Sequence, residues 1–305
     1  MKRALKITFL ALVAAFALLA AGRGFSLAVG EVPGDAIHGG RIYDNWILAL
    51  DTSPPEGNHP LWGQQDNNAR SGVITWRCVE CHGWDYKGAD GAYGPYSNHY
   101  SGFGGVESVI GSSQEDVIDW LDGTNNPEHN FLTWTTATAL NDLAAFLRTQ
   151  QVNTDLIIDP ATGEALGNRG DGMALYEAAC ASCHGDQGTE MNFGSTVAPL
   201  YLGDIAAADP WQALHKIRFG SPTSGRMPSS EEQDWSLSMV ADVLAYMQVL
   251  PRGNPDYAIL APNPDQTGAV ENQAQIEPIV WGTFVIIVVV GLNVAWDLYI
   301  KRQPI

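Results

Sequence analysis

The sequence predicts an all-α fold with two consecutive helical units followed by a C-terminal transmembrane helix. Three observations predict this fold. A Cys-x-x-Cys-His pentapeptide occurs twice, and apolar residues around both copies recur with the spacing of amphipathic helices. In addition, residues 279–300 form an almost wholly apolar run, about as long as a helix that crosses a bilayer.

The two pentapeptides contain all four cysteines of the chain. Their spacing is typical of c-type haem attachment, in which two thiols form thioethers with the haem vinyl groups and the next histidine binds the iron. A zinc site or a thioredoxin-like dithiol is an alternative, but histidine rarely follows the second cysteine of a zinc ribbon and no βαβ pattern surrounds either motif. We expect two covalently bound haem c groups, held by Cys78, Cys81 and His82 in the first motif and by Cys180, Cys183 and His184 in the second.

The segments before the two motifs indicate an internal repeat with one interruption. A helix that carries Tyr43 precedes the first motif, and a similar helix that carries Tyr176 precedes the second. Tyr43 lies 35 residues before Cys78, whereas Tyr176 lies four residues before Cys180. The first unit therefore contains an insertion of about 31 residues, at about 47–77.

The segments after the motifs also match. Each unit has a short amphipathic helix that stops at a glycine and a closing helix with apolar residues at i, i+3, i+4 and i+7. The short helices are predicted at 115–123 and 209–220, and the closing helices at 140–147 and 239–249. The units are thus assigned to 36–150 and 172–251, with a linker at 151–171 and a tether at 252–278.

This order of helix, haem-binding turn, short helix, ligand loop and final helix resembles class I c-type cytochromes over about residues 36–251. The resemblance implies two consecutive class I cytochrome c-like haem domains, each a small all-α domain around a covalent haem, with electron transfer as the usual activity. It also implies a methionine as sixth iron ligand, from a loop before the last helix. Met227, in Gly225-Arg-Met-Pro228, fits that loop in the second unit.

The first unit departs from the family because no methionine lies between His82 and Gly172. His129 follows Gly123 at nearly the same offset as Met227 follows Gly220, so His129 is the expected sixth ligand. Other positions remain open for this role: His99 as the main rival, an open coordination position, or a residue of the insertion such as His59.

The two ligand sets predict unequal redox potentials. A thioether sulfur favours reduced iron, so the His184/Met227 haem is expected at a higher potential than the His82/His129 haem. The other histidines, His38 and His215, fall at positions typical of surface or supporting side chains.

The two chain ends predict export and membrane attachment. Residues 1–28 have the basic start, apolar run and small residues of a secretory signal peptide, although an uncleaved anchor remains an alternative. The apolar run 279–300 is followed by Lys301 and Arg302, which places the C-terminus in the cytoplasm by the positive-inside rule. The expected location is the cytoplasmic membrane, single-pass, with the haem domains on the periplasmic side.

The net charge of −18 disfavours nucleic acid as a partner. It either speeds encounters with redox proteins that have basic docking surfaces or only keeps an exported protein soluble. The leading functional hypothesis is a membrane-tethered di-haem cytochrome c that relays single electrons and catalyses no bond-making step. One alternative is a di-haem redox enzyme, peroxidase-like or sulfur-compound-oxidising, with the insertion forming a substrate pocket. A second is a fixed cytochrome subunit of a larger membrane oxidoreductase.

Overall fold

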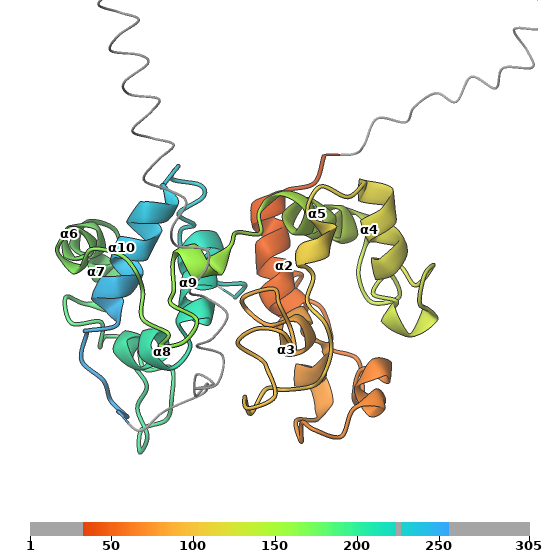
Figure 1. The fold of residues 1–305 in the computed structure, drawn as a ribbon, viewed down its shortest axis with the longest axis horizontal. Helices are drawn as coiled ribbons and strands as arrows, with labels where there is room; N and C mark the ends of the chain where they lie inside the picture. Colours follow the sequence, from red (N-terminus) through yellow and green to blue (C-terminus); the bar gives the residue numbers. More distant parts are fainter. Residues whose placement is uncertain (1–32, 224–226, 256–305) are drawn as a thin grey trace, which may run out of the picture.

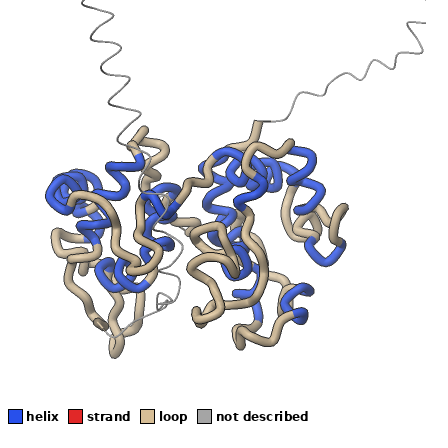
Figure 2. Tube along the Cα trace, in the orientation of Figure 1, coloured by secondary structure: helices blue, strands red, loops and turns tan. Residues whose placement is uncertain are grey.

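The computed structural model describes residues 33–223 and 227–255, and these residues are helical, connected by long loops (Figures 1 and 2). The first unit contains α2 (Ala36–Ala49), α3 (Cys78–His82), α4 (Gln114–Leu121) and α5 (Ala137–Thr149). The second unit contains α6 (Arg169–Ala179), α7 (Ala181–His184), α8 (Leu202–Ala208), α9 (Pro210–Phe219) and α10 (Leu237–Met247). Short 3-10 helices lie at Pro60–Gln64, Gly72–Trp76, Glu107–Val109, Pro127–His129 and Thr154–Leu156.

The first helix of each unit crosses the last helix at a glycine. A Cβ atom on Gly39 would lie 2.0 Å from the backbone oxygen of Asp142, and one on Gly172 would lie 1.9 Å from that of Asp242. Only glycine allows the two backbones to approach so closely. The pairs α2–α5 and α6–α10 therefore form equivalent frameworks in the two units.

Further equivalent hydrogen bonds fix these frameworks. The backbone N–H of Asp35 donates to Asp142 Oδ1 at 2.7 Å, and that of Asn168 donates to Asp242 Oδ1 at 2.6 Å. Asp35 and Asn168 are also the N-cap residues of α2 and α6, where their side chains accept backbone N–H groups that have no partner within the helix.

A buried tyrosine of each framework holds the turn that follows the Cys-x-x-Cys-His motif. Tyr43 Oη donates to the backbone oxygen of Gly83 at 2.6 Å, and Tyr176 Oη donates to that of Gly185 at 2.8 Å. Both glycines have positive φ, 73° and 77°, and end α3 and α7. The position of each motif is thus set by the helix that precedes it.

The inserted segment of the first unit folds against that unit. It contributes the 3-10 helices Pro60–Gln64 and Gly72–Trp76, and Trp76 is buried. Trp46 Nε1 of α2 donates to the backbone oxygen of Trp76 at 2.8 Å, while Trp76 Nε1 donates to that of Gly57 at 3.2 Å. The insertion therefore covers the end of α2 and leads directly into the first motif.

The two units pack against each other through α2 and α9 (Figure 1). His215 of α9 is 1 % exposed; its Nε2 donates to the backbone oxygen of Gly40 at 2.8 Å, and Tyr86 Oη donates to its Nδ1 at 3.1 Å. A Cβ atom on Gly40 would lie 2.5 Å from the Phe219 ring. The contact between the units is therefore a packed interface.

The segment 151–171, predicted as a linker, also packs against the helical units. Ile158 is fully buried, and Lys87 Nζ forms an ion pair with Asp155 Oδ2 at 2.6 Å. Gln248 Nε2 donates to the backbone oxygen of Gly163 at 2.7 Å. These contacts attach the connecting segment to both units.

The membrane-spanning part of the predicted fold class, and the single-pass location that followed from it, need correction. No helix in residues 33–223 and 227–255 is both long and apolar enough to cross a bilayer. The longest of them, α2, has 14 residues, or about 21 Å against the roughly 30 Å of a hydrocarbon core. The predicted signal peptide 1–28, most of the tether 252–278 and the apolar run 279–300 lie outside the described residues.

We expect Gly172→Ala to destabilise the second unit, because the new methyl group would overlap the α10 backbone. Overpacking costs more than the roughly 1 kcal/mol that alanine gains over glycine in a helix, so the free energy of unfolding should fall by about 1–2 kcal/mol. Urea denaturation measures this change. The matched control is Gly63→Ala, where nothing lies within 4 Å of the added Cβ; equal losses in both variants would contradict the close crossing.

Candidate haem-binding sites

The first Cys-x-x-Cys-His motif opens onto a largely apolar cavity of about 380 Å³. This volume falls within the ~300–1,000 Å³ typical of ligand and cofactor pockets. The motif and two further histidines line it, together with aromatic side chains: Cys78, Cys81, His82, His129, His59 and Phe131. None of the four cysteines in the chain forms a disulfide, so all four thiols are available for thioether bonds.

The His82 imidazole is held in one orientation by its Nδ1 atom, which lies 2.8 Å from the backbone oxygen of Gly104. Since a carbonyl only accepts, Nδ1 carries the proton and Nε2 has the free lone pair. Burial lowers the pKa of His82 to about 4, so the ring is neutral at physiological pH. His82 is therefore in the form that binds a metal through Nε2.

His129 has the same arrangement on another element. It ends the 3-10 helix Pro127–His129, and its Nδ1 lies 2.8 Å from the backbone oxygen of Trp120 in α4. Burial lowers the pKa of His129 as well. The His82 and His129 ring centroids are 6.4 Å apart. Two metal–nitrogen bonds of about 2.0 Å plus two ring radii give a similar separation, so the pair fits the two axial positions of one haem iron.

The structure places the alternative ligand His59 beside His129. Their ring centroids are 6.0 Å apart, and His59 also packs on Trp76 at 4.6 Å. His59 Nδ1 accepts the backbone N–H of Leu61 at 3.2 Å, so the proton of the neutral ring is on Nε2. This hydrogen bond favours a supporting role for His59.

The other alternative, His99, lies outside the first cavity. Its ring stacks on Tyr93 with centroids 4.4 Å apart, and its Nε2 lies 2.8 Å from Arg70 Nη2. It lines a second cavity, described below. The structure thus brings His82 and His129 together and places His99 elsewhere.

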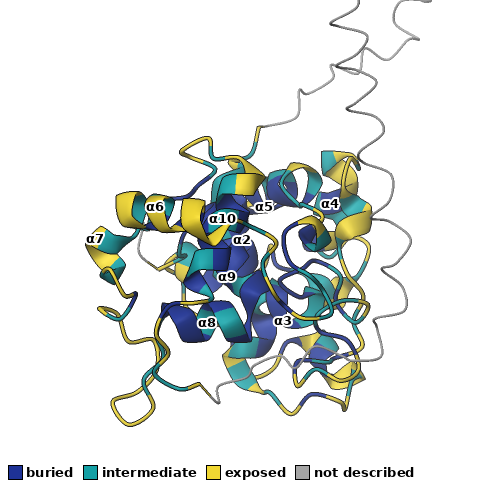
Figure 3. Ribbon diagram, turned by 60° about the vertical axis from the view of Figure 1, so that its left-hand side comes forward, coloured by how far each residue is buried: buried dark blue, intermediate teal, exposed yellow. Residues whose placement is uncertain are grey.

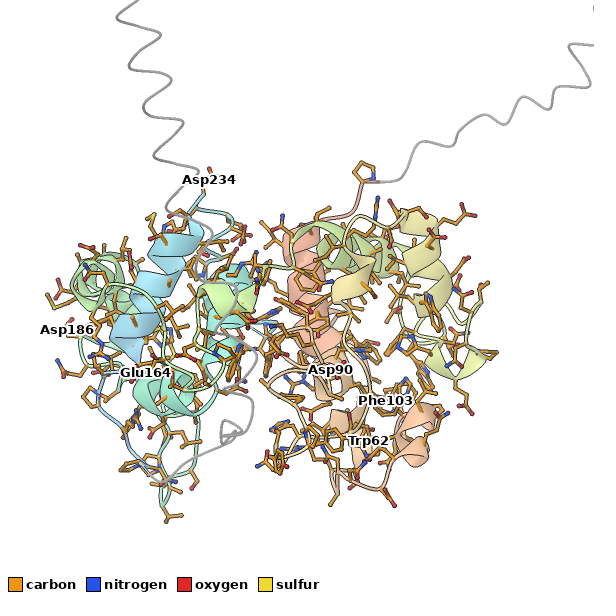
Figure 4. The ribbon with its side chains drawn as sticks, in the orientation of Figure 1. Trp62, Asp90, Phe103, Glu164, Asp186 and Asp234 are labelled. Atoms are coloured by element: carbon orange, nitrogen blue, oxygen red, sulfur yellow. The ribbon has the colours of Figure 1, made fainter. Side chains whose placement is uncertain are left out.

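The insertion forms one wall of the first cavity. Leu61, Thr75 and Trp76 line the cavity, and Trp62 packs beside the lining residue Phe103 with ring centroids 6.5 Å apart (Figure 4). The sequence repeat located this segment, and the enzyme alternative gave it a place at a pocket.

The second motif borders two adjoining cavities of about 720 and 500 Å³. Cys180, His184 and Met227 line both of them, so the motif and the predicted sixth ligand face the same space. Burial lowers the pKa of His184, and its buried Nδ1 has no hydrogen-bond partner. Helix α7 is more exposed than α8 and α9 (Figure 3), and Cys183 is exposed. The donor set fits a haem held by one histidine and one methionine.

A buried carboxylic acid also lines the larger cavity. Asp209 is 1 % exposed and caps α9 by accepting the backbone N–H of Gln212 at 2.9 Å. Burial, with a smaller contribution from the carboxylates of Asp85 and Glu80, raises the pKa of Asp209 to about 7. The sequence shows Asp209 only as a helix N-cap; its burial depends on the packing of the two units.

Comparison with known proteins finds one related family. Residues 167–247 match the family described as "Cytochrome C oxidase, cbb3-type, subunit III". No curated protein matches the chain. The family match supports a c-type cytochrome, that is, an electron-transfer protein with covalently bound haem c.

The match also corrects the predicted fold class, which contained two class I cytochrome c-like domains. A single cytochrome domain is found, and it covers the second unit. The first unit shares the framework of two crossing helices with the second unit but differs from it in two ways. It carries the insertion, and no methionine lies between His82 and Gly172.

We expect Asp209→Asn to remove a pH-dependent loss of stability. The unfolded-state pKa of aspartate is about 3.9, and the folded value is about 7. Between these values the folded state binds more protons, so wild-type stability falls as pH rises from about 4 to 7, by about 4 kcal/mol at most. Asparagine retains an oxygen for the cap but does not titrate. Asp209→Asn should therefore match the wild type at pH 4 and exceed it at pH 8.

Denaturant unfolding at several pH values measures this difference. Asp186→Asn, at an exposed position, is the control and should follow the wild-type pH dependence. If the free energy of unfolding changed with pH in the same way in Asp209→Asn and in the wild type, Asp209 would not be a buried carboxyl group with a raised pKa.

Proposed function

We propose that this chain is a di-haem c-type cytochrome that transfers single electrons between two redox proteins, with one haem in each helical unit. One observation carries the proposal: each motif borders a cavity that is also lined by a second side chain of a type that can bind haem iron, His129 in the first and Met227 in the second. The equivalent helix crossings at Gly39 and Gly172 also support two comparable sites.

In this proposal the first iron is bound by His82 and His129. The backbone oxygens of Gly104 and Trp120 keep both imidazoles in the required tautomer, and burial keeps them neutral. The second iron is bound by His184 and Met227, and Cys78, Cys81, Cys180 and Cys183 form the thioethers.

Haem c, when bound, supplies the one-electron couple of its iron. The protein contributes an environment that sets the potential of this couple. Apolar side chains such as Val117, Leu121 and Phe131 enclose the first cavity and exclude water from it. The choice of histidine or methionine as sixth ligand then separates the two potentials.

The proposed partners are redox proteins with basic docking surfaces. The chain has 34 acidic against 16 basic side chains, so its field accelerates encounters with positively charged proteins. This acceleration decreases at high ionic strength.

The family match favours a second candidate, a cytochrome subunit of a larger oxidoreductase, because the matched family is a subunit of an oxidase. The two candidates differ in the size of the native particle. Sizing after gentle extraction gives a particle near 32.9 kDa for an independent carrier and a much larger particle for a subunit.

We expect His129→Ala to remove the sixth ligand of the first haem and to leave the second haem unchanged. Low-temperature electron paramagnetic resonance should show loss of one low-spin ferric signal and the appearance of a high-spin signal. His99→Ala is the matched control, because His99 lies outside the first cavity; it should retain both low-spin signals. Retention of both signals in His129→Ala would transfer the role to another residue.

We also expect unequal potentials, with the His82/His129 haem below the His184/Met227 haem. A spectroelectrochemical titration should resolve two one-electron steps, and Met227→His should lower the potential of the upper step. The proposed ligand sets would be refuted if that substitution changed the lower step.

A further inference from the structure

A buried carboxyl group faces the second motif with no cation paired to it. Asp209, the N-cap residue of α9, lines the larger cavity together with His184 and Met227. It is 1 % exposed, and its Oδ1 accepts the backbone N–H of Gln212 at 2.9 Å. The ion pairs of the described residues include no lysine or arginine bound to Asp209. The charge of this carboxyl group is therefore not balanced by an adjacent cation.

The cations that line this cavity are paired with other carboxylates. Arg77 Nη2 and Lys216 Nζ both donate to the carboxylate of Asp44. Arg70 Nε and Arg77 Nη1 also lie 3.7 and 3.5 Å from the carboxylate oxygens of Glu80. Asp44 and Glu80 thus have cationic partners, whereas Asp209 has none.

The surroundings of Asp209 favour its protonated form. Burial and, to a smaller extent, the charges of Asp85 and Glu80 raise the pKa of Asp209 to about 7. Asp85 and Glu80 are themselves 2 % exposed, so solvent screens their charges only weakly. A carboxyl group poised near neutral pH changes its protonation when one further charge is placed close to it.

Three other titratable groups that line the cavity keep the same protonation near neutral pH. The hydroxyl groups of Tyr93 and Tyr176 retain their protons, because burial raises the pKa of each. Burial lowers the pKa of His184, so this imidazole ring is neutral. These groups therefore do not compete with Asp209 for a proton.

Two more titratable side chains near Asp209 have partners of their own. His99 lies between Arg70 and Glu80, with Nε2 2.8 Å from Arg70 Nη2 and Nδ1 3.6 Å from Glu80 Oε2. Asp204 belongs to α8, which packs against α9, and its carboxylate accepts three backbone N–H groups at 2.7–3.0 Å. Among the carboxyl groups around the cavity, Asp209 combines burial, the absence of a cation and a place on the cavity wall.

A haem attached through Cys180 and Cys183 would share the space that Asp209 lines, and its reduction would add one negative charge there. We propose that Asp209 takes up one proton from solvent when this haem gains one electron from a donor protein, and releases the proton when the electron leaves. The inference rests on the proposed function only in requiring a haem on Cys180 and Cys183.

Electrostatics gives the direction and size of this coupling. The added electron repels the ionised carboxylate and so increases the proton affinity of Asp209. For unit charges about 10 Å apart at an effective dielectric constant of about 20, this change is roughly tenfold. The coupling is reciprocal: protonated Asp209 favours ferrous iron, and ionised Asp209 favours ferric iron. The potential of the second haem should therefore fall as pH rises through about 7.

The first cavity offers a comparison within the same molecule. Of the described residues that line it, none is an aspartate or a glutamate. Its histidines, His82 and His129, are neutral because burial lowers the pKa of both. The potential of the first haem should therefore change little over the pH range in which that of the second haem falls.

The test is a spectroelectrochemical titration of the full-length holoprotein at several pH values between 5 and 9. In the wild type we expect the redox equilibrium of the second haem to move toward ferric iron by roughly tenfold over this range, or about 59 mV for one electron. Asp209→Asn keeps an oxygen for the cap but cannot titrate, so this dependence should disappear. The matched control is Asp171→Asn, because Asp171 is exposed and lines none of the three cavities; it should behave as the wild type.

Infrared difference spectra between the reduced and oxidised protein give a second readout. At pH 7 the wild type should gain the C=O band of a protonated carboxyl group on reduction, and Asp209→Asn should lack this band. The same pH dependence of the second haem in Asp209→Asn and in the wild type would overturn the proposal. If Asp209→Asn did not fold, a wild-type potential of the second haem that stayed constant with pH would overturn it equally.

The mass of the proteolytic peptide that contains Cys180 and Cys183 separates this inference from the proposed function. A peptide without haem would refute both. A peptide with haem, combined with a potential of the second haem that Asp209→Asn leaves unchanged at every pH, would refute the proton coupling alone.

Discussion

The geometry of the first unit depends on two hydrogen bonds that hold the imidazoles of His82 and His129 facing each other with their Nε2 atoms unprotonated. A metal ion bound by both rings would require this arrangement. Two backbone carbonyls, those of Gly104 and Trp120, meet this requirement by accepting from the Nδ1 atoms of His82 and His129. The carbonyls belong to separate segments, so both must be fixed in place. The bridge between Gly88 and Gly104 holds one, and the N-capped helix α4 holds the other.

In the second unit, fewer hydrogen bonds from the unit itself orient the histidine of the motif. The Nδ1 atom of His184 has no protein partner, and the cavity beside it is completed by residues of the first unit. Helix α9, which packs on α2, therefore forms part of the site together with the segment around α3. His215 and Asp44 are both 1 % exposed there, and the Asp44 carboxylate accepts from Arg77 and from Lys216. Since unpaired buried charges are costly, separating the units would destabilise this network.

Sequence patterns predicted the motifs and helices that are determined by residues close together in the chain. The Cys-x-x-Cys-His spacing located both motifs, and the 3.6-residue period located α5 and α10. Because no methionine lies between His82 and Gly172, the sequence predicted His129 as the sixth ligand, and the ring of His129 lies 6.4 Å from that of His82. Features that depend on packing between distant segments were not predictable: the buried position of His215 and the place of His99 at the second cavity.

Near-infrared magnetic circular dichroism of the fully oxidised protein decides whether the chain holds two haems with unlike axial ligands, as we propose. This spectrum gives separate charge-transfer bands for bis-histidine and for histidine–methionine ferric haem. We expect both bands, with comparable intensities, in a protein that contains two haems per chain. A single band, or the spectrum of a high-spin haem in place of either, would contradict it.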